Sequence, residues 1–395
     1  MNGDLSKKHK AISSSVTLAI DAKAKKMKAD GENIINFGAG EPDFKTPLNI
    51  RKAAIKAIED GMTGYTAASG LQNLKEAICE KLKNDNLLEY TPENIVVSNG
   101  AKHSLHNALL AICNPGDEVI VPLPYWVSYP ELVKLADAVP VFVETQEKDD
   151  FKYKKESIAS AITPKTKAII LNSPNNPTGT VYSEEDLKQI AEIAVQHNIY
   201  IIADEIYEKL VYEGKHISIA SLGDKIKDLT VVVNGMSKCY AMTGWRIGYA
   251  AANKEIAAMM ANIQSHATSN PNTIAQYASI EALKGDQAVI ADMVNAFSER
   301  KEYMVKKINS IRHLSCRMPR GAFYVMVNIS QVIGKKLNGV TIKNSMDLAE
   351  YLLSSAKVAV IPGSGFGTDE FIRLSYATSM DNIKDGLDRI QKALI

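Results

Sequence analysis

Short apolar runs rich in β-branched residues alternate with helical segments along the middle of the chain, from about residue 94 to residue 250. The runs are nearly continuous in apolar residues, which is typical of strands buried on both faces. Strands that alternate with helices predict an α/β fold, in which helices cover both sides of a mostly parallel sheet. The expected strands span residues 95–97, 118–121, 139–143, 168–171, 200–203, 230–233 and 247–250.

Helix start and stop signals flank these runs. A helix is expected over residues 13–30, closed by Gly31, and another from the cap Thr46, with Pro47 at its first position, to Gly61. Within the alternating region, helices are expected at residues 102–113, from near residue 125, and at 183–197 with Ser183 as cap.

The pattern changes near residue 286, where long charged helices at 298–310 and 346–355 join short strands at 323–325 and 358–360. We therefore predict a large domain over residues 48–285. A smaller α+β domain is predicted from residues 1–47 together with residues 286–395.

Composition narrows the class of protein. The formal net charge of +1 gives no electrostatic reason to expect nucleic acid or an anionic membrane as partner. The four cysteines are far apart and form no CxxC pair, which argues against a zinc site or a disulfide framework. No signal peptide and no membrane-length apolar run is visible, so the expected location is the cytoplasm.

Ser237 and Lys238 lie just past the strongly β-prone run at residues 229–234, and Arg246 lies close behind them. A lysine amine can form an imine with an aldehyde, while a serine and an arginine hold a phosphate on the same molecule. Pyridoxal 5'-phosphate is the biological aldehyde with a phosphate, so we predict it as the cofactor. The competing interpretation is an exposed lysine on a loop.

Other strand ends supply the remaining parts of such a site. Asn99-Gly100-Ala101-Lys102 joins a strand to a helix, where backbone N–H groups can bind an anion, although a plain tight turn is the alternative. Asp204 follows the strand at 200–203 and can pair with a protonated pyridine nitrogen. Tyr207 and Asn176 are candidates to contact the ring's phenolic oxygen, and Trp126 is a candidate to stack on the ring.

Arg373 lies within the apolar, strand-like run at residues 372–377. A buried arginine requires an anionic partner, and its planar guanidinium matches a carboxylate with two parallel hydrogen bonds. The carboxylate of an amino-acid substrate is one such partner. An internal salt bridge to an aspartate or glutamate is the other.

Together these segments make the chain resemble the class-I pyridoxal-phosphate-dependent aminotransferases of fold type I, and most closely the bacterial aspartate aminotransferase subgroup Ib. The segments that carry the resemblance run in family order along nearly the whole chain: residues 38–44, 65, 99–102, 124–126, 172–179, 204–208, 237–238, 242–246, 321–324 and 373–377.

The resemblance implies a role for each matching position. It makes Lys238 the residue that forms the imine and moves the proton, with Asp204 and Tyr207 as its catalytic partners. The implied cofactor contacts are Gly100, Ala101, Lys102, Trp126, Asn176, Asp204, Tyr207, Ser237, Lys238, Arg246 and, from a partner subunit, Tyr65. The implied substrate contacts are Gly40, Trp126, Asn176 and Arg373. A site shared in this way implies a homodimer.

The implied reaction is transamination between an L-amino acid, aspartate, and a 2-oxo acid, 2-oxoglutarate, in two ping-pong halves. An aromatic- or alanine-type aminotransferase and a C–S β-lyase are alternatives that would share Lys238, Asp204 and Arg373. Ser13 stands where members that accept prephenate carry a basic residue, so little prephenate activity is expected. Lys102 is the basic candidate for a second substrate carboxylate, and an exposed helix start is its alternative.

Two other classes of protein are disfavoured. A transcription regulator that binds pyridoxal phosphate would need a helix-turn-helix domain ahead of Thr46, where the sequence leaves no room for one. A Rossmann dehydrogenase would need a G-x-G-x-x-G between the strand and the helix of its first βαβ unit, and none is found there.

Overall fold

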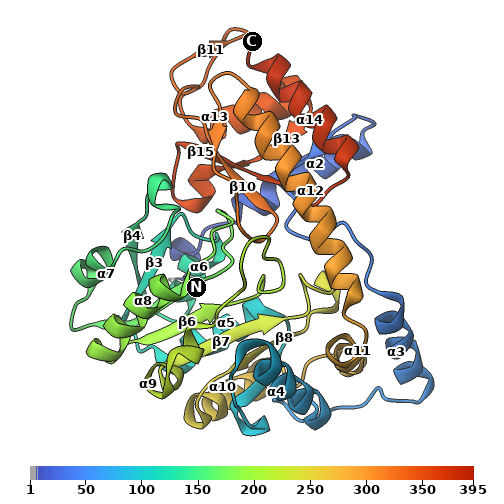
Figure 1. Cartoon of the computed structure of the whole chain (residues 1–395), viewed down its shortest axis with the longest axis vertical. Helices are drawn as coiled ribbons and strands as arrows, with labels where there is room; N and C mark the ends of the chain where they lie inside the picture. The colour runs from blue at the N-terminus through green and yellow to red at the C-terminus, as the bar shows by residue number, and fades with distance from the viewer. Residues whose placement is uncertain (1–5, 7) are drawn as a thin grey trace, which may run out of the picture.

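A seven-stranded sheet lies at the centre of the larger part of the molecule (Figure 1). The computed structural model describes residues 6 and 8–395, except for the side chain of His9. The strand order is β2-β8-β7-β6-β5-β3-β4, and β8 runs antiparallel to both neighbours while the other pairs are parallel. The predicted, mostly parallel sheet is therefore confirmed. Its strands are β2 (Ile95–Ser98), β3 (Glu118–Leu123), β4 (Val139–Glu144), β5 (Thr166–Asn172), β6 (Tyr200–Asp204), β7 (Thr230–Gly235) and β8 (Gly248–Ala251).

Successive residues of the central strands enter different hydrophobic clusters on opposite faces of the sheet. Ile170 and Ile202 pack on one face, whereas Ile169 and Ile201 pack on the other. The first face is covered by α5 (Ala101–Ile112), α6 (Ser128–Leu135) and α10 (Lys254–Ala267), and the second by α8 (Glu184–His197) together with α4 (Gln72–Asn86) and α11 (Thr273–Lys284). Burial on both faces explains why the apolar runs are continuous in the sequence.

The edge strand β4 departs from this expectation. Val139 is 47% exposed and Phe142 is 44% exposed, so this strand is not buried on both faces. Its β-branched residues predicted a strand correctly, but its position at the edge of the sheet leaves part of it in solvent.

A second, antiparallel sheet has the order β14-β15-β10-β9. It comprises β14 (Ile361–Pro362), β15 (Phe371–Ser375), β10 (Tyr324–Asn328) and β9 (Ser315–Cys316), and it packs with α12 (Ala288–Ser310), α13 (Ser345–Tyr351) and α14 (Met380–Ala393). Near the N-terminus, α2 (Val16–Ala29) precedes β1 (Ile35–Asn36), which pairs in parallel with β13 (Val358–Ala359). This pairing brings an N-terminal segment into the C-terminal part of the molecule, and α12 runs up the side between the two parts (Figure 1). The domain boundaries near residues 47 and 285 stay a prediction, and residues 1–5 and 7 lie outside the described part of the chain.

Several element starts differ from the prediction. The helix α3 (Leu48–Glu59) begins one residue later, with Pro47 as its cap, because the Thr46 hydroxyl donates to the carbonyl of Ala241 at 2.7 Å instead of capping the helix. The helix expected near Tyr125 begins at Ser128, because the backbone N–H of Tyr125 donates to the carbonyl of Phe366. The helix α12 begins at Ala288, well before the predicted start at residue 298.

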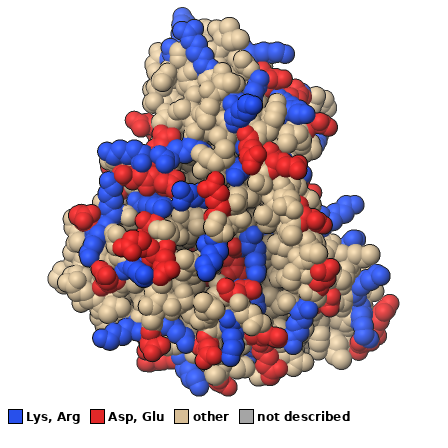
Figure 2. Space-filling model, viewed as in Figure 1, with Lys and Arg blue, Asp and Glu red and all other residues tan. Residues whose placement is uncertain are grey.

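Basic and acidic side chains are interspersed on the face shown in Figure 2, which agrees with the net charge of +1. Among the described residues, no helix is long and apolar enough to cross a membrane.

Candidate active site

A pocket of about 590 Å³ opens at the carboxyl ends of the parallel strands. Asn172 ends β5, Asp204 ends β6, and Ser237 lies just beyond β7, so parallel pairing brings these three side chains to the same edge of the sheet. Most of the predicted site residues line this pocket: Gly40, Ala101, Lys102, Trp126, Asn176, Asp204, Tyr207, Ser237, Lys238, Arg246 and Arg373.

The amine of Lys238 points into this pocket. Its Nζ donates to the carbonyl of Gly40 at 2.6 Å and lies 5.8 Å from the ring centre of Tyr207. Burial lowers the pKa of Lys238 to about 8, against the opposing effect of the Glu41 charge. A lysine with such a pKa has an appreciable neutral fraction near neutral pH, which is the form that attacks an aldehyde.

Asp204 is only 4% exposed at the floor of the pocket. Its carboxylate accepts hydrogen bonds from the Tyr129 hydroxyl at 2.8 Å and from the backbone N–H of Ile206 at 3.2 Å. Burial raises the pKa of Asp204 to about 6, although both hydrogen bonds act in the opposite direction. A cation beside this carboxylate would keep it ionised, as a protonated ring nitrogen does.

Two tyrosines that the sequence did not single out complete this side of the pocket. Tyr129 comes from α6 and holds Asp204, and the hydroxyl of Tyr324, from β10, lies 3.0 Å from the hydroxyl of Tyr207. Both are buried aromatic residues, and a buried tyrosine is normally read as core. Tyr324 is within the motif at residues 321–324 that carried part of the resemblance, whereas nothing local marked Tyr129.

The start of α5 forms a small cradle with Arg246. Gly100 has a φ of 87°, and a Cβ on it would collide with the guanidinium of Arg246. The guanidinium donates to the carbonyls of Thr243 at 2.9 Å and Asn99 at 3.4 Å. The first N–H groups of α5, Arg246 and the nearby Ser237 therefore form a donor set suited to a phosphate.

Arg373 is 3% exposed and projects from β15. Its guanidinium donates to Asn176 Oδ1 at 2.9 Å and to the carbonyl of Gly38 at 3.0 Å. Its Cζ lies 4.2 Å from the ring centre of Tyr324 and 5.1 Å from that of Phe366. Its Nε has no hydrogen-bond partner, and no carboxylate in the described part of the chain forms an ion pair with it. The internal salt bridge is therefore excluded within the described residues, and this buried cation requires an anion from outside the chain.

Of the predicted residues, Lys102 lines the pocket, whereas Gly100 and Tyr65 are not among its lining residues. Lys102 holds its Nζ 4.9 Å from the ring centre of Trp126, at the pocket, and burial lowers its pKa with a contribution from Arg246. Tyr65 is 93% exposed and does not line the pocket of its own chain. Its predicted contact with the cofactor thus requires a second copy of the chain.

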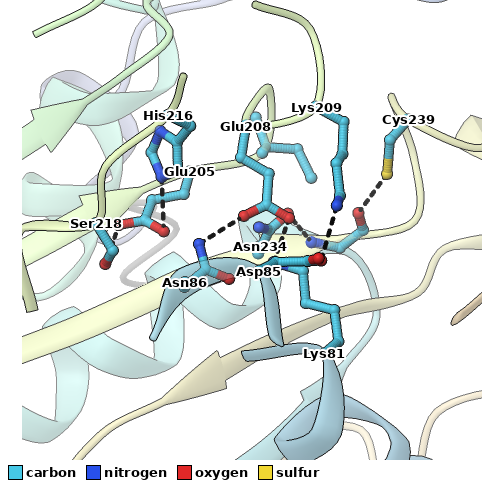
Figure 3. A network of polar contacts seen from close by, with 12 residues as sticks. Lys81, Asp85, Asn86, Glu205, Glu208, Lys209, His216, Ser218, Asn234 and Cys239 are labelled. Carbon is cyan, nitrogen blue, oxygen red and sulfur yellow. Dashed lines mark hydrogen bonds and ion pairs between the residues drawn. The ribbon is translucent and has the colours of Figure 1, made fainter. Parts of the chain in front are cut away.

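A buried ionic network includes Glu205 and Glu208, which follow β6 on the same turn as Asp204 and Tyr207 (Figure 3). Glu208 pairs with Lys81 and accepts from Asn86 at 2.9 Å, while Glu205 accepts from Ser218 at 2.6 Å and lies 3.1 Å from His216. The Glu205, Glu208 and His216 ligand atoms lie within 4.8 Å of one another, but the Lys81 ammonium already neutralises Glu208. We therefore assign this cluster to anchoring the turn.

The donor set fits pyridoxal phosphate: an amine for the aldehyde, a buried carboxylate for the ring nitrogen, and a cradle, closed by Arg246, for the phosphate. With a mostly parallel sheet that presents these groups at its carboxyl edge, fold and site together define a pyridoxal-phosphate-dependent enzyme of fold type I. Residues 32–390 match the family model described as "Aminotransferase class I and II", so the chain belongs to this family. It is an aminotransferase, and pyridoxal phosphate is its cofactor.

Similar proteins agree with this assignment. The chain is 50% identical to an aspartate aminotransferase of Bacillus sp. (strain YM-2), over 98% of both chains. It is 46% identical to an aspartate/prephenate aminotransferase of Nitrosomonas europaea, over 99% of both. The crystal structure of the aspartate aminotransferase of Rhizobium meliloti superposes with a TM-score of 0.96 at 43% identity, covering 99% of this chain and 98% of that one. The predicted family and fold class are therefore confirmed.

Proposed function

We propose that the chain transfers an amino group between L-aspartate and a 2-oxo acid, with 2-oxoglutarate as acceptor, in two ping-pong halves. The names of the similar proteins support aspartate as the donor. They do not favour the alternatives, an aromatic- or alanine-type aminotransferase and a C–S β-lyase.

The observation that carries this proposal is the unpaired, buried guanidinium of Arg373. Its two outer nitrogens are held by Asn176 and Gly38, so the plane of the group is fixed before a ligand arrives. A fixed guanidinium binds a carboxylate with less loss of entropy than a mobile one. We infer that it receives the α-carboxylate that all amino-acid substrates share.

Bound pyridoxal phosphate supplies the aldehyde that receives the amino group and the ring that withdraws electrons from it. The chain's own groups do the rest. Lys238 Nζ would accept the proton from the substrate α-carbon and deliver it to the carbon that bore the aldehyde, since its amine lies in the pocket beside the Gly40 carbonyl. Asp204 would hold the ring nitrogen, Tyr207 and Asn176 the phenolic oxygen, and Trp126 the ring face. The α5 start, Ser237 and Arg246 would hold the phosphate.

A dicarboxylic substrate needs a second cation, and we propose Lys102 for this role. Its Nζ lies over Trp126 at the pocket, where it can bind a carboxylate of the substrate. Lys102 forms no ion pair with another described residue. Prephenate is proposed to be a poor substrate. The backbone N–H of Ser13 donates to the carboxylate of Glu131 at 2.9 Å, so an acidic residue stands beside the position where a basic one would be needed.

We further propose a homodimer that works in the cytoplasm. Tyr65 lies outside its own pocket, and α3 exposes Leu48, Ile55 and Ile58 by 54% or more, which is an apolar surface suited to a partner subunit. None of the four cysteines is in a disulfide, as expected of a reducing compartment.

A panel of amino donors tests the substrate assignment. The purified enzyme is assayed with aspartate, glutamate, alanine and phenylalanine against 2-oxoglutarate and oxaloacetate. Aspartate with 2-oxoglutarate should give the highest kcat/KM. Alanine or an aromatic donor favoured by about tenfold or more, or about 1.4 kcal/mol in transition-state binding, would contradict aspartate as the substrate.

A further inference from the structure

Residues 38–44 form a segment that we call the strap, because it contacts two cations of the pocket, Arg373 and Lys238. The carbonyl of Gly38 accepts from Arg373 at 3.0 Å, and the carbonyl of Gly40 accepts from Lys238 at 2.6 Å. The position of the strap therefore sets where the guanidinium and the amine point.

Two carboxylates fasten the strap at different places. Glu41 Oε2 accepts a hydrogen bond from the Thr243 hydroxyl at 2.7 Å, and Asp43 pairs with Arg300 of α12 at 2.7 Å. Thr243 lies on the loop between Lys238 and Arg246, and its carbonyl accepts from Arg246 at 2.9 Å. Glu41 thus fastens the strap to the loop that carries the lysine, whereas Asp43 fastens it to a helix outside the pocket.

Glu41 also lines the pocket, in contrast to Asp43. The charged groups that face Lys238 are the carboxylates of Glu41 and Asp204 and the guanidinium groups of Arg246 and Arg373. The two arginines disfavour a positive charge on the lysine nitrogen. After burial, which lowers the pKa of Lys238, the Glu41 charge is the strongest influence and acts to raise it.

Glu41 itself faces Lys25 of α2, whose pKa is raised mainly by Asp21, with a small contribution from Glu41. Among the described residues, Glu41 therefore forms no close ion pair, because Lys25 pairs with Asp21 instead. The Glu41 charge remains directed at the pocket.

We propose that Glu41 is a positioning residue of the reaction: its carboxylate fastens the strap to the lysine loop and supplies the negative charge that stabilises a positive charge on the Lys238 nitrogen. This inference rests on the proposed function, because it concerns the lysine that moves the proton. It assigns to Glu41 a task that Asp43, the other acidic residue of the strap, does not share.

Three variants of the holoenzyme separate the parts of this proposal. Glu41→Gln keeps an oxygen that can accept from Thr243 but removes the charge. Thr243→Val keeps the charge but removes the hydrogen bond. Asp43→Asn is the matched control, since it removes a charge from the same strap at a place that pairs with Arg300. Each is titrated with pH, and the midpoint of the change in the absorbance of the bound cofactor is recorded.

Losing the Glu41 charge destabilises the protonated nitrogen, so Glu41→Gln should move the midpoint to lower pH by about half a unit in low salt. The shift should shrink in high salt, because Glu41 is exposed. Thr243→Val should leave the midpoint in place and raise the KM for amino acids, while Asp43→Asn should leave the midpoint in place.

An unchanged midpoint in Glu41→Gln, or an equal shift in Asp43→Asn, would overturn the role of the Glu41 charge. An unchanged KM in Thr243→Val would contradict the proposal that the Glu41–Thr243 hydrogen bond holds the strap in place. The readout is spectral, so an enzyme without aspartate activity would contradict the proposed function and still report this midpoint.

Discussion

At the scale of single residues, removing the buried Asp204 carboxylate should distinguish an effect on the rate of catalysis from an effect on cofactor binding. Asp204→Ala should lower kcat by about a hundred- to a thousandfold, because a preorganised charge opposite the ring nitrogen is lost. Affinity for pyridoxal phosphate should fall much less, since the proposed phosphate site at the α5 start and Arg246 would be left in place. Absorbance titration of the apoenzyme measures the affinity. A variant that kept its kcat and lost only cofactor affinity would contradict this role.

Arg373 permits a test of which carboxylate the pocket reads. Arg373→Lys keeps the charge and loses the two-point contact, so kcat/KM should fall by about a hundredfold for aspartate, glutamate and alanine alike. The effect should be uniform because the α-carboxylate is the only anionic group that all three donors share. Lys102→Ala is the matched variant, and it should lower activity with aspartate more than with alanine. If Arg373→Lys lowered kcat/KM for dicarboxylic donors only, Arg373 would instead bind the side-chain carboxylate of the substrate.

At the scale of elements, the turn after β6 depends on α4 through the pair formed by Glu208 and Lys81. Burial alone would raise the pKa of Glu208, but Lys81 and His216 outweigh it and lower the pKa to about 2. Since the folded-state pKa lies below that of a free glutamate, the pair stabilises the fold above about pH 4 and loses this effect as the pH falls toward 2.

Lys81→Met should therefore lower the free energy of unfolding at neutral pH by about 3–5 kcal/mol, because it leaves a buried carboxylate unpaired. Denaturant unfolding at several pH values measures this, and the difference from wild type should narrow as the medium becomes acidic. Asp60→Asn, which breaks the exposed pair with Lys56, is the control and should cause no measurable change. Equal losses in the two variants would contradict an anchoring role for the buried pair.

The sequence could predict the elements that have local causes. The central strands follow from continuous β-branched runs, and the capping of α8 (Glu184–His197) by Ser183 is confirmed by its hydrogen bond from Asp186. The predicted start of α3 was wrong because the Thr46 hydroxyl donates a hydrogen bond to the carbonyl of Ala241, a residue far along the chain. Tyr129 was missed for the same reason: its partner Asp204 is 75 residues away, and only the fold brings them together.

At the scale of the whole molecule, Tyr65 makes the dimer testable through activity. We expect Tyr65→Ala and Lys238→Ala each to be nearly inactive alone. Mixed under conditions that exchange subunits, they should recover roughly a quarter of wild-type activity, because half of the dimers are hybrids and each hybrid has one intact site. Recovery is measured against each variant mixed with itself. No recovery, despite hybrids seen by native mass spectrometry, would contradict a site completed by the partner.

The most direct test of the account is the aspartate–2-oxoglutarate reaction of the purified holoenzyme beside that of Lys238→Ala. The wild-type enzyme should be yellow, hold the cofactor covalently after borohydride reduction, and produce glutamate and oxaloacetate. The variant should bind the cofactor without a covalent link and lose about 10⁴-fold or more in kcat, since in the proposed mechanism one amine both holds the aldehyde and moves the proton. Wild-type turnover in Lys238→Ala would contradict the central claim.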